Sequence, residues 1–329
     1  MSSVTVNGLA PGPSRARRWL SGFRERETWA AYLFILPWLF GFFTLTLGPM
    51  LFSAYYSFTN YGLQQIAGLD KTKTVGLANY HRILNDGTAH LALKNTFIYT
   101  LMMVPARIVL ALLLALVLVR VGERLGGVFR TIFYIPHITP PVAVGVLVLY
   151  LFNGGFGVVN KGLAHLGIKG PYWTIDPNWI KPTIALMDIW ACGGTMVILL
   201  AALYGVPRHL YEAASMDGAS KLRQFFNVTL PMISPALFFC FIILTLAGLN
   251  QFAVAYTAFF GSAGGVGSTG TNEAALLYAI YLFKEAFQSF EMGYASALAW
   301  VLFGICLTIT GINVLVSRRF VFYQGSERS

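Results

Sequence analysis

The sequence predicts an all-α integral membrane protein with six transmembrane helices. Three observations lead to this prediction. Of the 329 residues, 56% are hydrophobic and only 11% are charged, less than half of the roughly 25% that soluble domains carry. The charges are also bunched, which leaves six apolar stretches long enough to cross a bilayer as helices, at residues 29–53, 95–119, 130–152, 181–206, 234–259 and 296–316. This composition excludes a soluble enzyme, a disordered chain and a fibre.

The six stretches are expected to be helices because each is too long for a strand and is apolar around its whole circumference. The first follows the basic, aromatic segment RRWLSGFRERETW, which we expect to lie along the inner membrane surface. It is longer than the core of a secretory signal and lacks a small-residue cleavage site, so we interpret it as a permanent anchor. In the third stretch, His137 stands between prolines in YIPHITPP, which indicates a distorted helix more than a metal site.

The distribution of basic residues predicts that both termini are cytoplasmic. Segments on the side of the termini hold 14 Lys or Arg, those on the other side hold 8, and Arg107 lies within a span. We therefore divide the chain into a cytoplasmic basic tail (1–28), a first transmembrane helix with an outer loop (29–90), a transmembrane core (91–317) and a second cytoplasmic tail (318–329). The glycine-rich GSAGGVGSTGTNEA after the fifth span is expected to be a flexible external loop.

The net charge of +10 is explained by basic residues that face anionic lipid headgroups, so the predicted partner is membrane lipid and not nucleic acid. The cysteines Cys192, Cys240 and Cys306 lie in apolar stretches without ligand spacing and are expected to be buried thiols. No motif for a catalytic residue, a metal site or a bound cofactor is present. At depth in the spans only Arg107 and Asp188 can ionise, too few for an ion-driven transporter. These two residues either pair with each other or with another subunit, or take part directly in transport.

The inner loop between the fourth and fifth spans, residues 207–233, is the most informative segment. Residues 210–235, which include most of this loop and the entry to the next span, read LYEAASMDGASKLRQFFNVTLPMISP. Pro207 suits a helix start, and Asp217-Gly218 would end that helix with a sharp bend. A second amphipathic helix is expected from Ala219 to about Val228, before prolines 231 and 235. This pattern predicts two short helices on the cytoplasmic face, which form a docking surface for a cytoplasmic partner.

The same residues resemble the EAA loop of ABC importer permeases, specifically of the carbohydrate-uptake type. The residues that match the loop pattern are Glu212, Ala213, Ala214, Asp217, Gly218, Leu230 and Pro231, with Val228 where the family prefers Ile. VGLANYHRIL, LKNTFIYT and YLFKEAFQSFEMGYASALAW resemble other parts of the first of two permeases in such systems, whereas GSAGGVGS replaces the usual TGGP.

The resemblance implies a type I ABC importer permease fold and a set of partners. These are a second permease that makes a heterodimer, two ATP-binding subunits, and an extracytoplasmic solute-binding protein. It implies a location in the bacterial or archaeal cell membrane. Because this chain has no Walker motif, ATP and Mg would be used by the partner ATPase, and this chain would bind no cofactor and not be an enzyme. The EAA loop would couple it to that ATPase.

A sugar pathway needs hydrogen-bonding groups and aromatic faces in a mostly apolar cavity. In GLNQFAVAYT of the fifth span, Asn250, Ala253, Val254 and Thr257 would share one helical face. Asn250 either binds solute or joins helices. The pathway candidates are Asn250, Gln251, Tyr256, Thr257, Asp188, Trp190 and Asn313.

The predicted function is the permease subunit of an ATP-driven importer of a sugar or oligosaccharide. Two alternatives stay open: an ABC permease for glycerol phosphate or a polyol, and an ATP-independent secondary carrier or channel. The sequence does not distinguish one sugar from another, nor does it say which of the two permeases contacts the solute.

Overall fold

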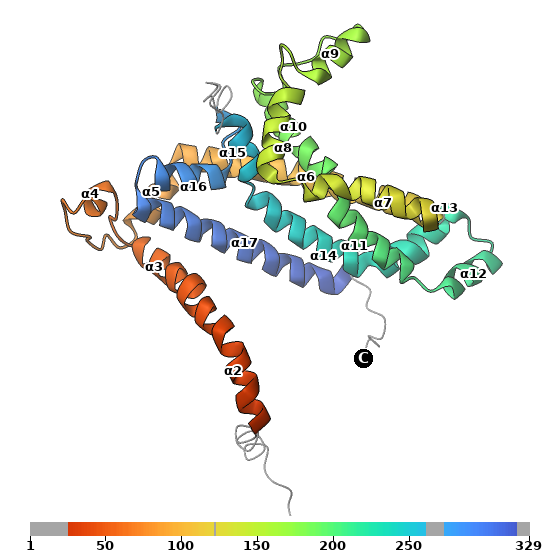
Figure 1. Cartoon of the computed structure of the whole chain (residues 1–329), viewed down its shortest axis with the longest axis horizontal. Helices are drawn as coiled ribbons and strands as arrows, with labels where there is room; N and C mark the ends of the chain where they lie inside the picture. The colour runs from red at the N-terminus through yellow and green to blue at the C-terminus, as the bar shows by residue number, and fades with distance from the viewer. Residues whose placement is uncertain (1–25, 122, 261–272, 321–329) are drawn as a thin grey trace, which may run out of the picture. The chain divides into compact units, whose positions relative to one another are not determined.

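The computed structural model describes residues 26–121, 123–260 and 273–320 (Figure 1). The chain divides into two compact units, residues 1–56 and 57–329. Within the described ranges the regular structure is helical, and four helices are long and apolar enough to cross a membrane: Ala31–Tyr56, Gly87–Arg120, Lys221–Phe259 and Met292–Ser317. Two bent helix pairs raise the number to six if each pair is one span. The predicted all-α fold with six spans is therefore confirmed.

The first unit is a single long helical run. Helix α2 (Arg26–Gly41) continues through a π-helical turn, η1 (Phe42–Leu47), into α3 (Gly48–Tyr56). No residue of η1 or α3 is buried, as expected of a helix whose apolar side chains face lipid. The predicted surface segment lies almost wholly outside the described residues, as do most of the C-terminal tail and the glycine-rich loop.

The second unit begins with the predicted outer segment, which contains α4 (Leu63–Ile66) and α5 (Ala78–Asn85). Two side chains of α5 tie it to its surroundings. The Asn79 amide donates to the carbonyls of Ser57 and Thr59, at 2.9 Å each. The Arg82 guanidinium forms an ion pair with Glu291 and lies 4.0 Å from the centre of the Tyr294 ring.

Asp86 joins this outer segment to the core. Its carboxylate accepts hydrogen bonds from the backbone N–H groups of Thr88 and Ala89, so it caps the next helix. It also accepts the hydroxyls of Tyr281 and Tyr294. Partial burial raises the pKa of Asp86, but these hydrogen bonds outweigh that effect and hold the pKa below its ordinary value of 3.8.

The core is built around α6 (Gly87–Arg120), which contacts α7, α10, α11, α14 and α16. The remaining long elements are α7 (Glu123–Ile138), α8 (Pro141–Leu151), α9 (Val158–His165), α10 (Pro177–Trp190), α11 (Gly193–Tyr204), α14 (Leu230–Leu249), α15 (Ala253–Phe259), α16 (Tyr278–Phe287) and α17 (Met292–Phe320). Ala111 and Ala115 are fully buried against Met196 and Leu199, because small residues let membrane helices approach closely.

The third and fourth spans are broken. Between α7 and α8 the axis bends by 92°, beside Pro136, Pro140 and Pro141. This confirms the distortion expected around His137. The fourth span, predicted as one helix over 181–206, also bends, by 48° between α10 and α11. The prediction of an unbroken helix was therefore wrong, because the sequence has no proline at this point to indicate a break. Ala191 and Cys192 instead leave the helix ahead of Gly193, a residue that favours breaks.

Candidate functional site

The inner loop forms a helix–bend–helix. Helix α12 (Arg208–Met216) follows Pro207, and the bend places Gly218 at φ +74°, a conformation that residues with a side chain rarely adopt. The N–H groups of Gly218 and Ala219 donate to Ser215 and Ala214 at 3.1 and 2.9 Å, which closes the end of α12. The two predicted short helices and the glycine bend are therefore present.

The second short helix differs from the prediction because it does not stop. Helix α13 (Lys221–Gln224) runs through a π-helical turn, η2 (Phe225–Thr229), straight into α14. A proline inside a helix clashes with the carbonyl four residues earlier. The wider turn of η2 lies directly before Pro231 and gives the chain a way to relieve that clash.

Gln224 holds the two short helices together. Its side chain is 4% exposed, and its amide donates to the Ser215 hydroxyl at 2.9 Å and to the Ala219 carbonyl at 3.1 Å. A further hydrogen bond of 2.9 Å joins the hydroxyls of Tyr211 and Thr229. The sequence analysis missed these residues. The only available signal was that a glutamine stands beside two phenylalanines in an amphipathic stretch.

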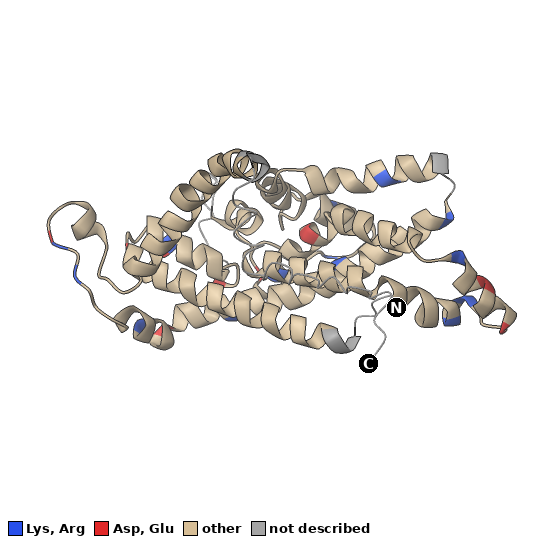
Figure 2. Ribbon diagram, turned by 90° about the horizontal axis from the view of Figure 1, so that it is seen from below, with Lys and Arg blue, Asp and Glu red and all other residues tan. Residues whose placement is uncertain are grey.

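The residues that match the EAA pattern occupy two places. Glu212, Ala213, Asp217 and Gly218 are exposed, whereas Ala214, Leu230 and Pro231 are half-buried. The Glu212 carboxylate forms no ion pair with any described residue. Figure 2 shows charged residues gathered at the ends of the long helices, with few along their middles. The exposed side of the loop is thus partly charged, and internal hydrogen bonds hold its two short helices together.

A second group of polar residues lies inside the core. Asp188 of α10 accepts the Tyr99 hydroxyl at 2.5 Å and the Gln251 amide at 2.8 Å, both at Oδ2. The Gln251 amide also donates to the Tyr99 hydroxyl at 3.1 Å. We call Tyr99, Asp188 and Gln251 the buried polar cluster.

Arg107 does not form the expected ion pair with Asp188. Its Nη2 instead donates to the Ala191 carbonyl at 2.8 Å, and its Nε has no hydrogen-bond partner within the described chain. The reason is that Ala191 follows the last turn of α10, where the break leaves backbone carbonyls without helical partners. The Asp188 carboxylate instead accepts its hydrogen bonds from Tyr99 and Gln251.

The comparisons with known proteins decide the family. The family model for the binding-protein-dependent transport system inner membrane component matches residues 107–322, which include the loop, Arg107 and Asp188. The chain belongs to this family.

Two relatives and one solved structure agree with this assignment. The permease is 36% identical to the probable ABC transporter permease protein YesP of Bacillus subtilis, over 92% of this chain and 95% of the relative. It is 30% identical to the sulfoquinovosyl glycerol transport system permease protein SmoG of Agrobacterium fabrum, over 92% and 94%. A structure of a bacterial alginate ABC transporter, in complex with a periplasmic protein bound to alginate pentasaccharide, has the same fold. Its TM-score is 0.74 at 24% identity, over 92% of this chain and 98% of that chain.

In the permease, the expected polar face of the fifth span is interrupted. Helix α14 ends at Leu249 and α15 starts at Ala253, with Phe252 outside helical geometry at φ −134°. Asn250 therefore does not share a helical face with Val254 and Thr257, and that prediction was wrong. Asn250 and Gln251 instead stand at the break between α14 and α15, where backbone groups without helical partners can hydrogen-bond with polar side chains.

The pathway candidates are spread over several environments. Asn250 is exposed, and its amide donates to the Leu246 carbonyl at 2.9 Å and contacts Cys306 Sγ at 3.8 Å, at a cavity of about 300 Å³. Tyr256 stacks between Phe252 and Phe260, with ring centres 4.9 and 5.9 Å away.

The other candidates do not come together with Asn250. Thr257 packs where α15 meets Gly145 of α8, Trp190 is exposed, and the Asn313 amide is buried without a partner in the described residues. Only Gln251 and Asp188 among the candidates are joined directly. In the described ranges, no group of three His, Cys, Asp or Glu residues could hold a metal ion.

Proposed function

We propose that this permease is one subunit of an ATP-driven importer that moves a sugar or oligosaccharide across the cell membrane. The solute would be delivered by an extracytoplasmic binding protein. A second permease would complete the pathway as a heterodimer, and two ATP-binding subunits would use ATP and Mg. The carbohydrate class is supported by the solutes in the names of SmoG and the alginate transporter.

One observation carries the coupling role: the exposed face of α12 is connected to the core by an unbroken helix. The loop leads from Gly218 through α13 and η2 into α14 without a break, and the run continues to the interruption at Asn250. Gln224 locks α12 to the start of this run. A push on α12 by a cytoplasmic subunit would therefore be transmitted along α14 to Gln251 and the buried polar cluster as a rigid-body movement.

The orientation in this proposal follows from the excess of basic residues on the side of the termini, which makes that side cytoplasmic. Glu212 would then face the ATPase and offer its unpaired carboxylate to a basic partner. A cysteine introduced within residues 60–90 should react with an impermeant thiol reagent from outside, and one within 209–225 should not. The opposite labelling would contradict the orientation.

The coupling role is tested by co-purification of the ATPase with loop variants. Gly218→Asp should greatly reduce recovery of the ATPase, because an aspartate at φ +74° strains the bend. Glu212→Ala should reduce it less. Gly167 provides a matched control, since it is exposed and has φ +72° in the turn that follows α9, so Gly167→Asp should leave recovery unchanged. Asp70→Ala is the control for Glu212→Ala.

Wild-type recovery and transport in both loop variants would show that this loop is not the coupling element.

The energy source and the solute are tested with the complete transporter in vesicles. ATP hydrolysis should rise with one class of solute in a panel of sugars, oligosaccharides, glycerol phosphate and polyols. Uptake that proceeds in ATP-depleted vesicles under a proton or sodium gradient would favour a secondary carrier instead.

A further inference from the structure

A cavity of about 500 Å³ lies beside the loop, between the end of α6, the end of α11 and the segment from α12 to η2. Three of its lining residues are cationic, namely Arg120, Arg208 and Lys221, and none of its lining residues is acidic. We call it the basic cavity. None of the three cations forms an ion pair with another described residue. Their charge is therefore available to a ligand.

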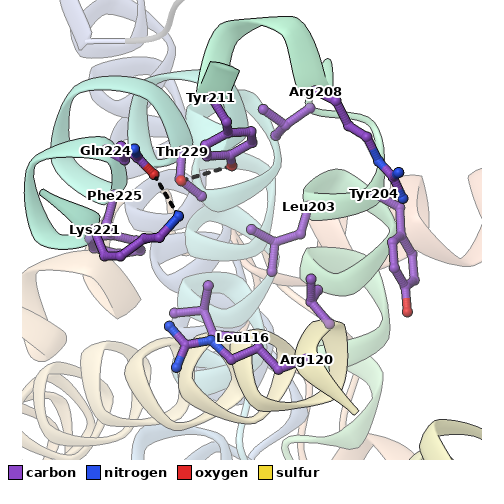
Figure 3. Close-up of a pocket in the computed structure, with 12 residues that line it drawn as sticks. Leu116, Arg120, Leu203, Tyr204, Arg208, Tyr211, Lys221, Gln224, Phe225 and Thr229 are labelled. Atoms are coloured by element: carbon purple, nitrogen blue, oxygen red, sulfur yellow. Dashed lines mark hydrogen bonds between the residues drawn. The ribbon is translucent and has the colours of Figure 1, made fainter. Parts of the chain in front are cut away.

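The cations stand at the level where membrane helices end. Arg120 is the last residue of α6, and Lys221 is the first residue of α13. Figure 3 shows the ammonium of Lys221 and the guanidinium of Arg120 on the same side of the basic cavity, with Arg208 beside Tyr204 on the opposite side. A second cavity of about 440 Å³ shares Tyr204 and adds Arg130. Positive charge is thus concentrated around the ends of α6 and α11.

Part of the wall is apolar. Leu116, Val119, Leu203, Val206 and Phe225 all line the basic cavity. Val119 and Tyr204 are 43% and 59% exposed, so the apolar wall continues onto the outer surface of the helices. A ligand that fits this cavity needs a negatively charged group next to a hydrocarbon part.

The polar edge of the cavity is already organised. The Gln224 side-chain oxygen accepts a hydrogen bond from the Lys221 ammonium at 3.4 Å. The Gln224 amide nitrogen donates to the Ser215 hydroxyl and the Ala219 carbonyl. The Tyr211 and Thr229 hydroxyls satisfy each other at 2.9 Å. These contacts leave the charges of Lys221 and Arg120 unneutralised, and a phosphate group would neutralise them with charge-assisted hydrogen bonds.

We propose that the basic cavity binds the headgroup phosphate of an anionic phospholipid from the cytoplasmic leaflet, with an acyl chain along the apolar wall. Basic pockets between membrane helices on the cytoplasmic side suit such headgroups. A free phosphate shares the anionic chemistry but makes no use of the apolar wall. A lipid held by Arg120 and Lys221 would bridge the end of α6 to the start of α13, and so would brace the base of the loop.

The test is native mass spectrometry of the full-length chain, purified in detergent and titrated with phosphatidylglycerol or with zwitterionic phosphatidylcholine. The wild type should retain phosphatidylglycerol preferentially. Arg120→Gln and Lys221→Gln should each weaken retention about fivefold, and the double variant about 30-fold, from the attraction typical of one Lys or Arg near an anionic lipid surface. Arg120→Lys with Lys221→Arg should restore it, which separates loss of charge from loss of fold.

The matched control is Arg223→Gln with Lys161→Gln, which removes the same charge from exposed residues that do not line the cavity. It should retain phosphatidylglycerol as the wild type does. Equal retention by the Arg120/Lys221 double variant and this control would overturn the proposal. So would displacement of phosphatidylglycerol by millimolar inorganic phosphate, because that result would assign the cavity to a soluble anion.

Discussion

The buried polar cluster gives the sharpest prediction about stability, and the variant that tests it is Tyr99→Phe. Tyr99 is fully buried, so phenylalanine keeps the ring in place and removes only the hydroxyl. That hydroxyl donates to Asp188 at 2.5 Å and accepts from Gln251 at 3.1 Å. The variant therefore leaves one carboxylate oxygen with a single donor in an apolar core.

A hydrogen bond to a charged group contributes about 1.5–3 kcal/mol. We expect Tyr99→Phe to destabilise the chain by that amount, which corresponds to a fall in Tm of roughly 2–4 °C at about 2.1 cal/mol/K of unfolding entropy per residue. The assay is thermal unfolding of the purified full-length chain in detergent. Tyr150→Phe is the matched control, since Tyr150 is 64% exposed and its hydroxyl should contribute little.

A double-mutant cycle with Gln251→Leu extends the test. Because the two side chains contact each other and share Asp188 Oδ2, their effects should not add, with a coupling of about 0.5–3 kcal/mol. This result would also test whether Gln251 has a structural role, since a residue that only contacts solute would show no coupling in the absence of solute. A Tm for Tyr99→Phe equal to that of the Tyr150→Phe control would refute the reasoning.

Two further outcomes follow from other contacts. The pKa of Asp86 is lowered by hydrogen bonds that include those from Tyr281 and Tyr294. The stabilisation by this carboxylate is therefore present above the ordinary pKa of 3.8 and is lost as pH falls through the lower folded value. The difference in Tm between wild type and Asp86→Asn should shrink from about pH 5 to pH 2, and a constant difference would contradict this. An added Cβ at Gly145 would lie 2.7 Å from the Thr257 Cβ, so Gly145→Val should cost about 1–3 kcal/mol in thermal unfolding, whereas valine at the open Gly162 site should show no clash.

The sequence predicted the parts of this fold that depend on local pattern. The apolar stretches identified the spans, and the Asp217-Gly218 bend was visible because only glycine readily takes a positive φ there. The contacts that tie the loop were not visible. Gln224 bonds to Ser215 across nine positions, and nothing in a helical pattern says which polar neighbour an amide will choose.

The contacts of the buried polar cluster were harder to predict because their residues are even further apart in the sequence. Tyr99 and Asp188 are 89 positions apart, and Tyr99 and Gln251 are 152 apart. Asp188 and Gln251 were noticed because each stands in an apolar run, but Tyr99 was not, and which partners they find depends on how the spans pack. The break at Asn250 was missed because no proline marks it, and Gly248, two residues earlier, still lies within α14.

The broken spans raise the question of what satisfies their free backbone groups, since unpaired groups are expensive in a bilayer. Helix α6 supplies one such partner. Arg107 donates to the Ala191 carbonyl at the break of the fourth span. The Tyr99 hydroxyl contacts the side chains of Asp188 and Gln251, and Gln251 stands in the break of the fifth span. One continuous helix therefore contacts both interruptions.

The same helix also serves the start of α16. The Asn95 amide donates to the Leu276 carbonyl at 3.1 Å, and the Thr96 hydroxyl accepts the Tyr278 N–H, the first of α16, at 2.8 Å. With Tyr99 and Arg107, these residues lie within about a third of the circumference of α6. The polar side of α6 thus takes the role that water plays at helix ends in soluble proteins. Because these partners lie on one face of one helix, polar groups at the breaks of the fourth and fifth spans can be kept away from lipid inside the chain itself.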